Sequence, residues 1–243
     1  MTFEKLLLKP ENFRAGKNYK ASNIVFPVKS DNTLYIIKKP RNFSSMIELY
    51  YIFQSKFFYR SKKYFTKKQR LLNEVEKLKH LNGKLSPILF AYNNKLLVRE
   101  YIDGKKLNEL ETDEDLVNGL ESALYSLELI HDENITVGDA HVKNVLVNSF
   151  GAAFWLDFES SLGNRKEAKA FDLLKFVYST YTLTRNFEIT EHLASKVSSY
   201  PDKNVKTKVK DLVNEHMNWF SAWFTARIPN KHHKKIEKIL LKC

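Results

Sequence analysis

The sequence predicts an α+β protein of two lobes, with a β-rich N-terminal lobe over residues 1–102 and a mostly helical C-terminal lobe over residues 103–243. Two observations lead to this prediction. Runs rich in β-branched and aromatic residues, with one helical stretch among them, fill the first part of the chain, and helical periodicity dominates the second. Strands and helices also come in blocks, and that order disfavours an alternating βαβ sheet.

A hairpin opens the predicted N-terminal lobe. The segment SNIVFPVKSDNTLYIIKKP holds two β-rich runs, Ser22–Val28 and Thr33–Lys39, around the turn-forming KSDN, and Pro40 ends the second run. Residues 44–80 then become helical, with Leu71, Val75 and Leu78 at helical spacing. Two short strands, SPILFAY and NKLLVREYI, complete the predicted sheet.

A long helix opens the predicted C-terminal lobe. Thr112 is placed to cap it, acidic residues fill its first turn, and a stripe of Leu116, Leu120, Leu124, Leu127 and Ile130 lies on one face. The stretch NVLVNSFGAAFWLDF predicts two short strands around a turn. From about Lys166 the pattern is helical to the end.

Composition limits the classes of function. The chain carries 40 basic and 28 acidic side chains, a formal charge of +12, which favours an anionic partner such as a nucleotide, nucleic acid, acidic protein or membrane surface. The single cysteine, Cys243, excludes an intrachain disulfide. MTFEKLLLKPENF is too short and polar for a secretion signal, and no apolar run reaches the roughly 18 residues of a membrane span. We therefore expect a soluble, cytoplasmic protein.

The chemistry is concentrated in ITVGDAHVKNVLVN and the FWLDFESS that follows. Asp139 and Asn144 are five residues apart, and Asp157 lies thirteen residues after the asparagine. Such a set suits phosphoryl transfer to a hydroxyl: one carboxylate orients the hydroxyl and accepts its proton, while the second carboxylate and the amide oxygen hold Mg²⁺ against nucleotide phosphates. Hard oxygen ligands are those that Mg²⁺ prefers.

The stretch VGDAHVKN resembles the G-D-x-H-x-x-N catalytic loop of the protein-kinase-like superfamily, as found in aminoglycoside phosphotransferases and lipopolysaccharide-core kinases, and LDFE stands where protein kinases have D-F-G. The resemblance implies a bilobal kinase-like fold with ATP and Mg²⁺ as cofactors. It implies that Asp139 is catalytic, that Asn144 and Asp157 bind the metal, and that His141 supports the loop.

The same resemblance implies a nucleotide-binding lysine at the end of a strand and a glutamate on the following helix. YIIKKP supplies Lys38, with Lys39 as the alternative. LLNEVEKL supplies Glu74, which precedes the apolar Val75 and Leu78, with Glu76 as the alternative.

Two further parts of the resemblance lie downstream. LVREYIDGKKL looks like a hinge, in which the backbone from Glu100 to Ile102 would bind adenine. Asp172, at the start of a predicted helix in KAFDLLKFVYS, would brace the catalytic loop.

Several departures from the family pattern narrow the class. Val137 stands where a histidine usually precedes the catalytic Asp, and Glu159 replaces the glycine of D-F-G. No convincing glycine-rich loop is visible, although Gly16, Lys17 and Lys20 offer phosphate contacts. The segment before Asp172 is too short for a peptide-docking activation loop, which disfavours an ordinary regulated protein kinase. Small-molecule and lipid-sugar kinases remain, together with compact atypical kinases of the RIO type or the KEOPS type.

A basic and aromatic insertion, RNFSSMIELYYIFQSKFFYRSKKYFTKKQR, separates Lys38 from Glu74. It is similar to the region before the helix glutamate in lipopolysaccharide-core and Kdo kinases, and it favours a lipopolysaccharide-type sugar as the hydroxyl-bearing acceptor. The insertion also suits peripheral contact with anionic lipid at the inner face of the membrane. A protein acceptor, as in RIO or KEOPS-type kinases, is the alternative.

Two other classes stay open. A nucleotide-binding pseudokinase scaffold would explain the weak glycine loop, although the retained Asp139, Asn144 and Asp157 count against it. A basic nucleic-acid-binding protein would explain the charge, but it leaves the spaced Asp and Asn set without a purpose, and no nucleic-acid-binding motif is recognisable.

Overall fold

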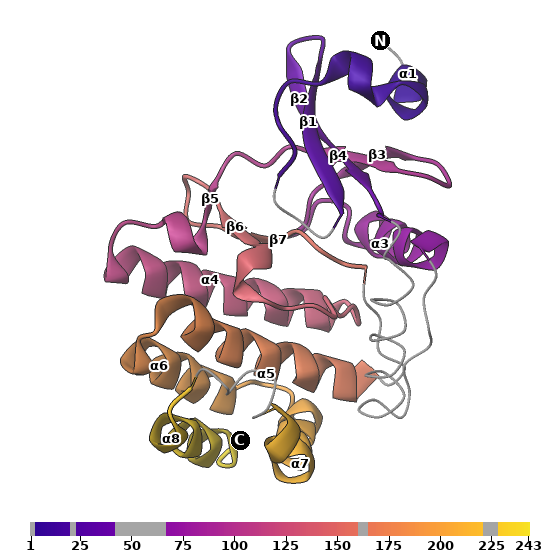
Figure 1. The fold of residues 1–243 in the computed structure, drawn as a ribbon. Helices are drawn as coiled ribbons and strands as arrows, with labels where there is room; N and C mark the ends of the chain where they lie inside the picture. The colour runs from indigo at the N-terminus through magenta and orange to yellow at the C-terminus, as the bar shows by residue number, and fades with distance from the viewer. Residues whose placement is uncertain (1–2, 20–22, 42–66, 160–164, 221–227) are drawn as a thin grey trace. The chain divides into compact units, whose positions relative to one another are not determined.

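The computed structural model describes residues 3–19, 23–41, 67–159, 165–220 and 228–243. The chain divides into two compact units (Figure 1). The first unit consists of Met1–Asp103 and Leu156–Gly163, and the second consists of Gly104–Trp155 and Asn164–Cys243. Most of the predicted basic and aromatic insertion falls on residues 42–66, and Lys20 on residues 20–22, so both lie outside the described residues.

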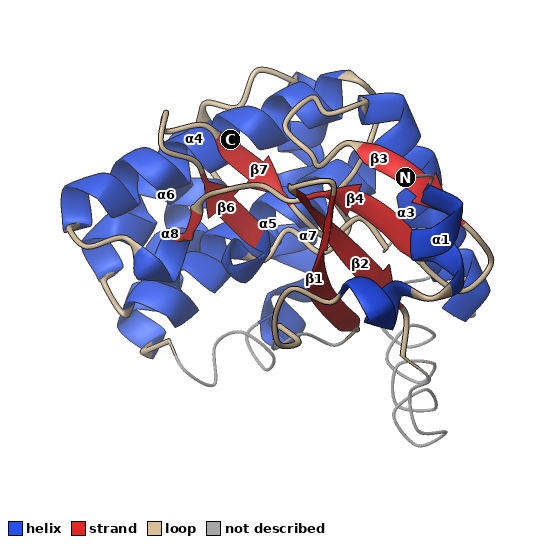
Figure 2. Ribbon diagram, turned by 90° about the horizontal axis from the view of Figure 1, so that it is seen from above, coloured by secondary structure: helices blue, strands red, loops and turns tan. Residues whose placement is uncertain are grey.

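The first unit is built on a four-stranded antiparallel sheet in the order β1-β2-β4-β3 (Figure 2). Its strands are β1 (Ile24–Ser30), β2 (Thr33–Lys39), β3 (Leu89–Tyr92) and β4 (Leu97–Glu100). The predicted first hairpin is present, with β1 shifted two residues towards the turn. Asp31 and Asn32 form that turn at φ of 48° and 62°, a left-handed conformation that Asp and Asn tolerate and that matches the strand twist.

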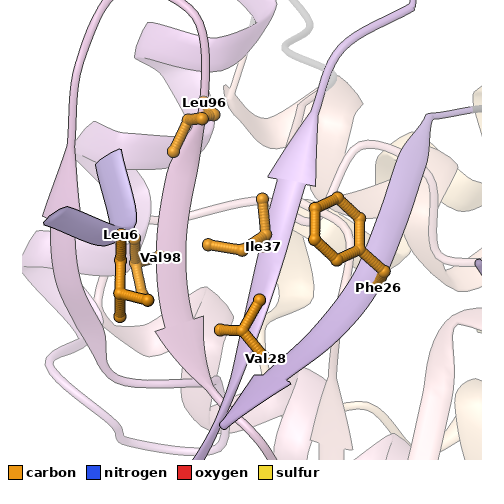
Figure 3. Packing of buried hydrophobic residues seen from close by; sticks show 6 residues of the cluster. All are labelled: Leu6, Phe26, Val28, Ile37, Leu96 and Val98. Carbon is orange, nitrogen blue, oxygen red and sulfur yellow. The ribbon is translucent and has the colours of Figure 1, made fainter. Parts of the chain in front are cut away.

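An N-terminal helix, which the sequence did not predict, covers part of this sheet. Helix α1 (Phe3–Leu8) packs on β3 and β4, and a 3-10 turn, η1 (Pro10–Phe13), follows it. Figure 3 shows the buried core that results, formed by Leu6, Phe26, Val28, Ile37, Leu96 and Val98. Each of these side chains is nearly inaccessible to water, and their burial stabilises the sheet that positions the residues at the end of β2.

Helix α3 (Lys67–Leu81) is the described part of the predicted helical region. Leu71, Val75 and Leu78 are buried, as their spacing predicts. Asn82 and Gly83 end the helix with positive φ values of 47° and 82°, the usual termination by residues that tolerate the left-handed conformation.

The second unit begins with a small sheet and a long helix. Strands β5 (Lys105–Lys106), β6 (Val145–Val147) and β7 (Ala153–Trp155) pair antiparallel, and η2 (Leu107–Glu109) leads to helix α4 (Asp113–Asp132). The Thr112 side chain accepts a hydrogen bond from the Asp115 amide at 3.0 Å, so the predicted cap is present. Helix α4 packs on β7, where the Trp155 indole donates to the Ala123 carbonyl at 3.2 Å.

In the described part of the second unit four more helices follow, as the helical pattern after Lys166 predicts. They are α5 (Arg165–Thr184), α6 (Phe187–Ser198), α7 (Lys203–Phe220) and α8 (Asn230–Leu240). Helix α5 packs on α6 and α7, and α6 packs on α8. A short 3-10 turn, η3 (Val142–Asn144), lies in the predicted catalytic loop and contacts α5. Within the described ranges, no helix has the length and apolar character needed to cross a membrane.

Candidate active site

Lys38 is the centre of a buried charge cluster in the first unit. It lies near the end of β2, and only 3% of its side chain is exposed. Its Nζ lies 2.7 Å from Glu74 Oε2, 3.0 Å from Asp157 Oδ1 and 2.9 Å from Glu159 Oε1. An ammonium group enclosed in this way is held at one position, which a phosphate-binding lysine requires.

Glu74, on α3, is held by two cations. Lys38 pairs with one carboxylate oxygen, and Arg99 of β4 pairs with the other at 3.2 Å. Arg99 also donates to the backbone carbonyl of Leu156, immediately before Asp157. Of the predicted alternatives, Glu76 is exposed, and Lys39 pairs with the exposed Glu11 at 2.9 Å.

Burial and neighbouring charges shift the pKa of both members of the Lys38–Glu74 pair. Burial alone would lower the pKa of Lys38, but Asp157, Glu74 and Glu159 together raise it above its ordinary value. Burial raises the pKa of Glu74 to about 7, and the cations Lys38 and Arg99 limit that rise. The lysine keeps its proton, and both oxygens of the glutamate face a cation. The ionised pair is therefore the state that these contacts stabilise.

Glu159, which the resemblance aligns with the glycine of D-F-G, is held by several contacts. Its carboxylate pairs with Lys38 and, at 3.3 Å, with Arg70 of α3, and it accepts a hydrogen bond from the Asn23 side chain. Its backbone carbonyl accepts from the side-chain NH₂ of Asn73 at 3.4 Å. The segment after Asp157 is thereby tied to β2, to α3 and to the residue before β1.

In the second unit, Asp172 of α5 braces the predicted catalytic loop. Its carboxylate accepts hydrogen bonds from the amides of Val137 and Gly138, each at 2.8 Å. His131, at the end of α4, lies 3.3 Å from the same carboxylate, and its other ring nitrogen lies 2.9 Å from the Tyr200 hydroxyl. Because these groups are buried or nearly so, they fix the backbone immediately before Asp139.

Asp139 follows this braced backbone and forms an ion pair with Lys175 of α5. Burial alone would raise the pKa of Asp139, but the Lys175 ammonium, with smaller contributions from His141 and Lys143, holds that pKa below its usual value. The side chain is therefore a carboxylate at neutral pH and can accept a hydrogen bond from a hydroxyl. No residue other than Asp139 in the loop from Val137 to Asn144 has a carboxylate.

His141 and Asn144 support the loop around Asp139. Burial and the positive charges of Lys143 and Lys175 lower the pKa of His141 to about 4, although Asp139 works in the other direction. The ring is thus neutral at pH 7, and its Nδ1 accepts from the Lys143 amide at 3.2 Å. The Asn144 side-chain NH₂ donates to the Asp139 carbonyl at 2.9 Å, and this orientation leaves its Oδ1 as an oxygen that can bind a cation.

The predicted hinge residues, Glu100 to Ile102, begin at the last residue of β4. Glu100 is the last residue of that strand, and its amide already donates to the Ile88 carbonyl at 2.9 Å. Its side chain also accepts from the Ile88 amide at 3.0 Å. Ile102 is half-buried in the irregular segment that follows. Of the backbone groups predicted to meet adenine, the Glu100 amide is therefore engaged within the sheet.

The structure thus gathers the predicted residues into two sets, one in each unit. Lys38, Glu74 and Asp157 come together in the first, with Glu159 beside them. The second holds Asp139, His141, Asn144 and Asp172. Sequence reasoning missed Arg99 and Lys175, whose partners lie 25 and 36 residues away along the chain.

Comparisons with known proteins identify the fold. No protein-family model matches the chain, and no curated protein matches its sequence. The solved structure of WaaP in complex with acyl carrier protein is similar with a TM-score of 0.54 and 13% identity, over 98% of this chain and 96% of that chain. An ethanolamine kinase of Plasmodium vivax is similar with a TM-score of 0.52 and 12% identity, over 98% of this chain and 84% of that chain. These likenesses show the fold.

Proposed function

We propose that the chain is a phosphotransferase that uses ATP and Mg²⁺. The chain has the protein-kinase-like fold, which confirms the predicted fold class and the predicted resemblance. It would move the γ-phosphoryl group to a hydroxyl. The observation that carries the proposal is the buried Lys38, ion-paired with Glu74 and lying beside Asp157. A nucleotide site of this type needs a fixed lysine, and the Glu74 carboxylate with its two cations fixes it.

The residues of the first unit would bind the nucleotide. Lys38 would hold the α- and β-phosphates, and Glu74 would keep its ammonium in place. The backbone from Glu100 to Ile102 would meet the adenine, with the Ile102 groups as the better candidates, because the Glu100 amide is engaged. The Asp157 side chain is 24% exposed, so its carboxylate can bind a metal ion without first leaving a fully buried position.

The residues of the second unit would carry the transfer. Asp139 accepts a hydrogen bond from the acceptor hydroxyl and takes its proton as the new oxygen–phosphorus bond forms. The bond between the γ-phosphorus and the bridging oxygen breaks, and the electron pair leaves with ADP. Asp172 and His141 hold the loop in place, as their hydrogen bonds indicate.

Asp157 and Asn144 are the proposed metal ligands. Their donor atoms are a carboxylate oxygen and an amide oxygen, and the hydrogen bond from the Asn144 NH₂ leaves that amide oxygen available. This donor chemistry fits Mg²⁺, which when bound neutralises charge on the phosphates.

A lipopolysaccharide-type sugar is the acceptor that we propose to test first. The motif VGDAHVKN and the basic insertion support this choice by their resemblance to lipopolysaccharide-core kinases, and WaaP shares the fold. A protein acceptor of the kind that RIO or KEOPS-type kinases use is the alternative. The charge of +12 supports an anionic surface, including a membrane, as a peripheral partner of the proposed enzyme.

The experiment measures binding and transfer in one preparation. The melting temperature is recorded with and without ATP and Mg²⁺, because a ligand that binds only the folded state raises it by mass action. Transfer of ³²P from labelled ATP to the protein, and to added lipopolysaccharide, is then measured. We expect the shift and the label with the natural chain, and absence of any shift at saturating nucleotide would refute the proposal.

Matched variants separate binding from transfer. Asp157→Ala should abolish the Mg²⁺-dependent part of the shift, whereas Asp139→Asn should keep the shift and lose transfer. Asp211→Ala is the control, because that residue lies on the surface of α7, where it pairs with Lys208 at 2.7 Å. A binding shift with no transfer to any acceptor would favour the pseudokinase alternative.

A further inference from the structure

One face of helix α5 contacts the proposed catalytic loop at several points. Asp172, Lys175 and Ser179 lie at positions i, i+3 and i+7, a spacing that places them on the same side of a helix. Asp172 accepts from the amides of Val137 and Gly138, and the Ser179 hydroxyl accepts from the Val142 amide at 3.1 Å. Lys175 lies between these two anchors along the helix.

Lys175 contacts the one loop side chain that has a carboxylate. Its ammonium pairs with Oδ1 of Asp139, and that oxygen is buried. The Asp139 side chain as a whole is nevertheless 31% exposed. Its exposed surface therefore lies on its other atoms, and Oδ2 is the oxygen left to meet an acceptor hydroxyl.

The loop itself supplies no equivalent contact. His141 is neutral at pH 7, and its Nδ1 is engaged with the Lys143 amide. Lys143 is exposed, whereas the Lys175 side chain is only 12% exposed. Lys175 therefore loses less side-chain conformational entropy than Lys143 would when it pairs with a carboxylate. Lys175 is therefore the cation placed to fix the direction of the Asp139 carboxylate.

We propose that Lys175 is a positioning residue for phosphoryl transfer, holding Oδ1 of Asp139 so that Oδ2 points to the acceptor hydroxyl. This inference rests on the proposed function, because it assigns Lys175 a purpose through the proton acceptor of that reaction. It predicts that loss of the ammonium leaves nucleotide binding intact and slows the transfer step. A carboxylate free to rotate would spend less time in the productive direction.

Lys169→Met is the matched control for Lys175→Met. Both lysines lie on α5, both are largely buried, and both substitutions remove one positive charge. Lys169 differs in its partner, because its ammonium lies 3.4 Å from the Asn134 side chain and no contact with the loop carboxylate is found among the described residues. Lys175→Arg is the conservative variant, since it restores a cation to the same place.

The test measures Mg²⁺-dependent release of phosphate from ATP, with water as the acceptor, and the affinity for ATP by calorimetry. For Lys175→Met we expect kcat to fall roughly 10- to 100-fold, with KM and Kd for ATP changed less than about twofold. Lys175→Arg should recover most of kcat. Lys169→Met should keep kcat, even if its melting temperature falls as much.

A double-mutant cycle shows whether Lys175 acts through Asp139. In an Asp139→Asn background, Lys175→Met should change the residual kcat less than about twofold, because the oriented carboxylate is already absent. Equal effects in both backgrounds would overturn the proposal, as would an unchanged kcat in Lys175→Met. If Lys175→Met does not fold, Lys175→Gln removes the same positive charge and takes its place in the comparison, with Lys175→Arg still as the variant that keeps the charge.

The two proposals fail in different ways. If the natural chain binds and turns over ATP while Lys175→Met matches it, the positioning role is wrong and the phosphotransferase function stands. If the natural chain itself neither binds nor turns over ATP with Mg²⁺, the function is refuted and the positioning role with it.

Discussion

Replacement of Lys38 by methionine tests the charge cluster directly. Methionine is unbranched and apolar, so it fills much of the same space but leaves Glu74, Asp157 and Glu159 without the ammonium that lies 2.7–3.0 Å from each. Removing one partner of a buried ion pair costs about 3–5 kcal/mol, because the remaining charge stays desolvated. Glu74 keeps Arg99 and Glu159 keeps Arg70, and Asp157 is partly solvated, so we expect about 3–4 kcal/mol.

Urea unfolding followed by tryptophan fluorescence and circular dichroism measures this loss. For a chain of this size the same loss lowers the melting temperature by roughly 6–16 °C. Lys39→Met is the control on the neighbouring residue. Its side chain is 26% exposed and pairs with Glu11, which is 52% exposed, so its removal should cost no more than about 1 kcal/mol.

The pH dependence of the Lys38→Met defect gives a second check. Without the ammonium, buried carboxylates take up protons more readily in the folded chain than in the unfolded chain. Protonation neutralises them, so the stability of the variant relative to the natural protein should rise as pH falls from 7.5 to 5. If Lys38→Met loses no more stability than Lys39→Met, or if the gap is independent of pH, the description of Lys38 as the centre of a desolvated cluster is wrong.

Three further predictions concern single residues. Thr112→Ala should lower the free energy of unfolding by about 1 kcal/mol through loss of the α4 cap, and urea unfolding with Thr112→Ser as control checks it. Glu159→Gln should lower the melting temperature yet tighten ATP binding in calorimetry, because one carboxylate fewer competes with phosphate for Lys38; weaker binding would contradict this. Burial lowers the pKa of His233, and Glu237 opposes this shift. The unfolded chain therefore protonates this histidine at a higher pH than the folded chain does, so the free energy of unfolding should fall as pH drops below about 6.5. His233→Phe, which can keep the stacking on Tyr178, should flatten this slope between pH 7.5 and 5, and an unchanged slope would rule the histidine out.

The block order of strands and helices was enough to predict the fold class, because hydrophobic periodicity and caps are local signals. Thr112 and the stripe on α4 are examples, and so is the turn at Asp31 and Asn32. Helix α1 was missed, since its six residues show too little of a helical period to recognise. Strand β5 was missed for the same reason, as two residues carry no alternation.

The residues of the candidate site were predictable from sequence only where they stand at the fixed spacing of a known motif. Asp139, Asn144 and Asp157 stand at spacings that a resemblance can recognise. The sequence favours Lys38 but leaves Lys39 as an alternative, because two adjacent lysines at a strand end differ clearly only when the sheet buries one of them. Arg99 and Lys175 are recognisable only once the fold brings them to Glu74 and Asp139. The i, i+3 spacing of Asp172 and Lys175 is the one sequence signal that points to Lys175.

The anchoring of Glu159 has a consequence for chemical inhibition. Phe158 is fully buried between Asp157 and Glu159, and the glutamate is held by Lys38, Arg70 and Asn23. A compound that acts by displacing the Phe158 side chain from its buried position would have to break these contacts as well. Inhibitor discovery against this chain should therefore favour small molecules that bind at Lys38 in place of the nucleotide that we propose. Compounds that require an outward-turned phenylalanine should yield few hits.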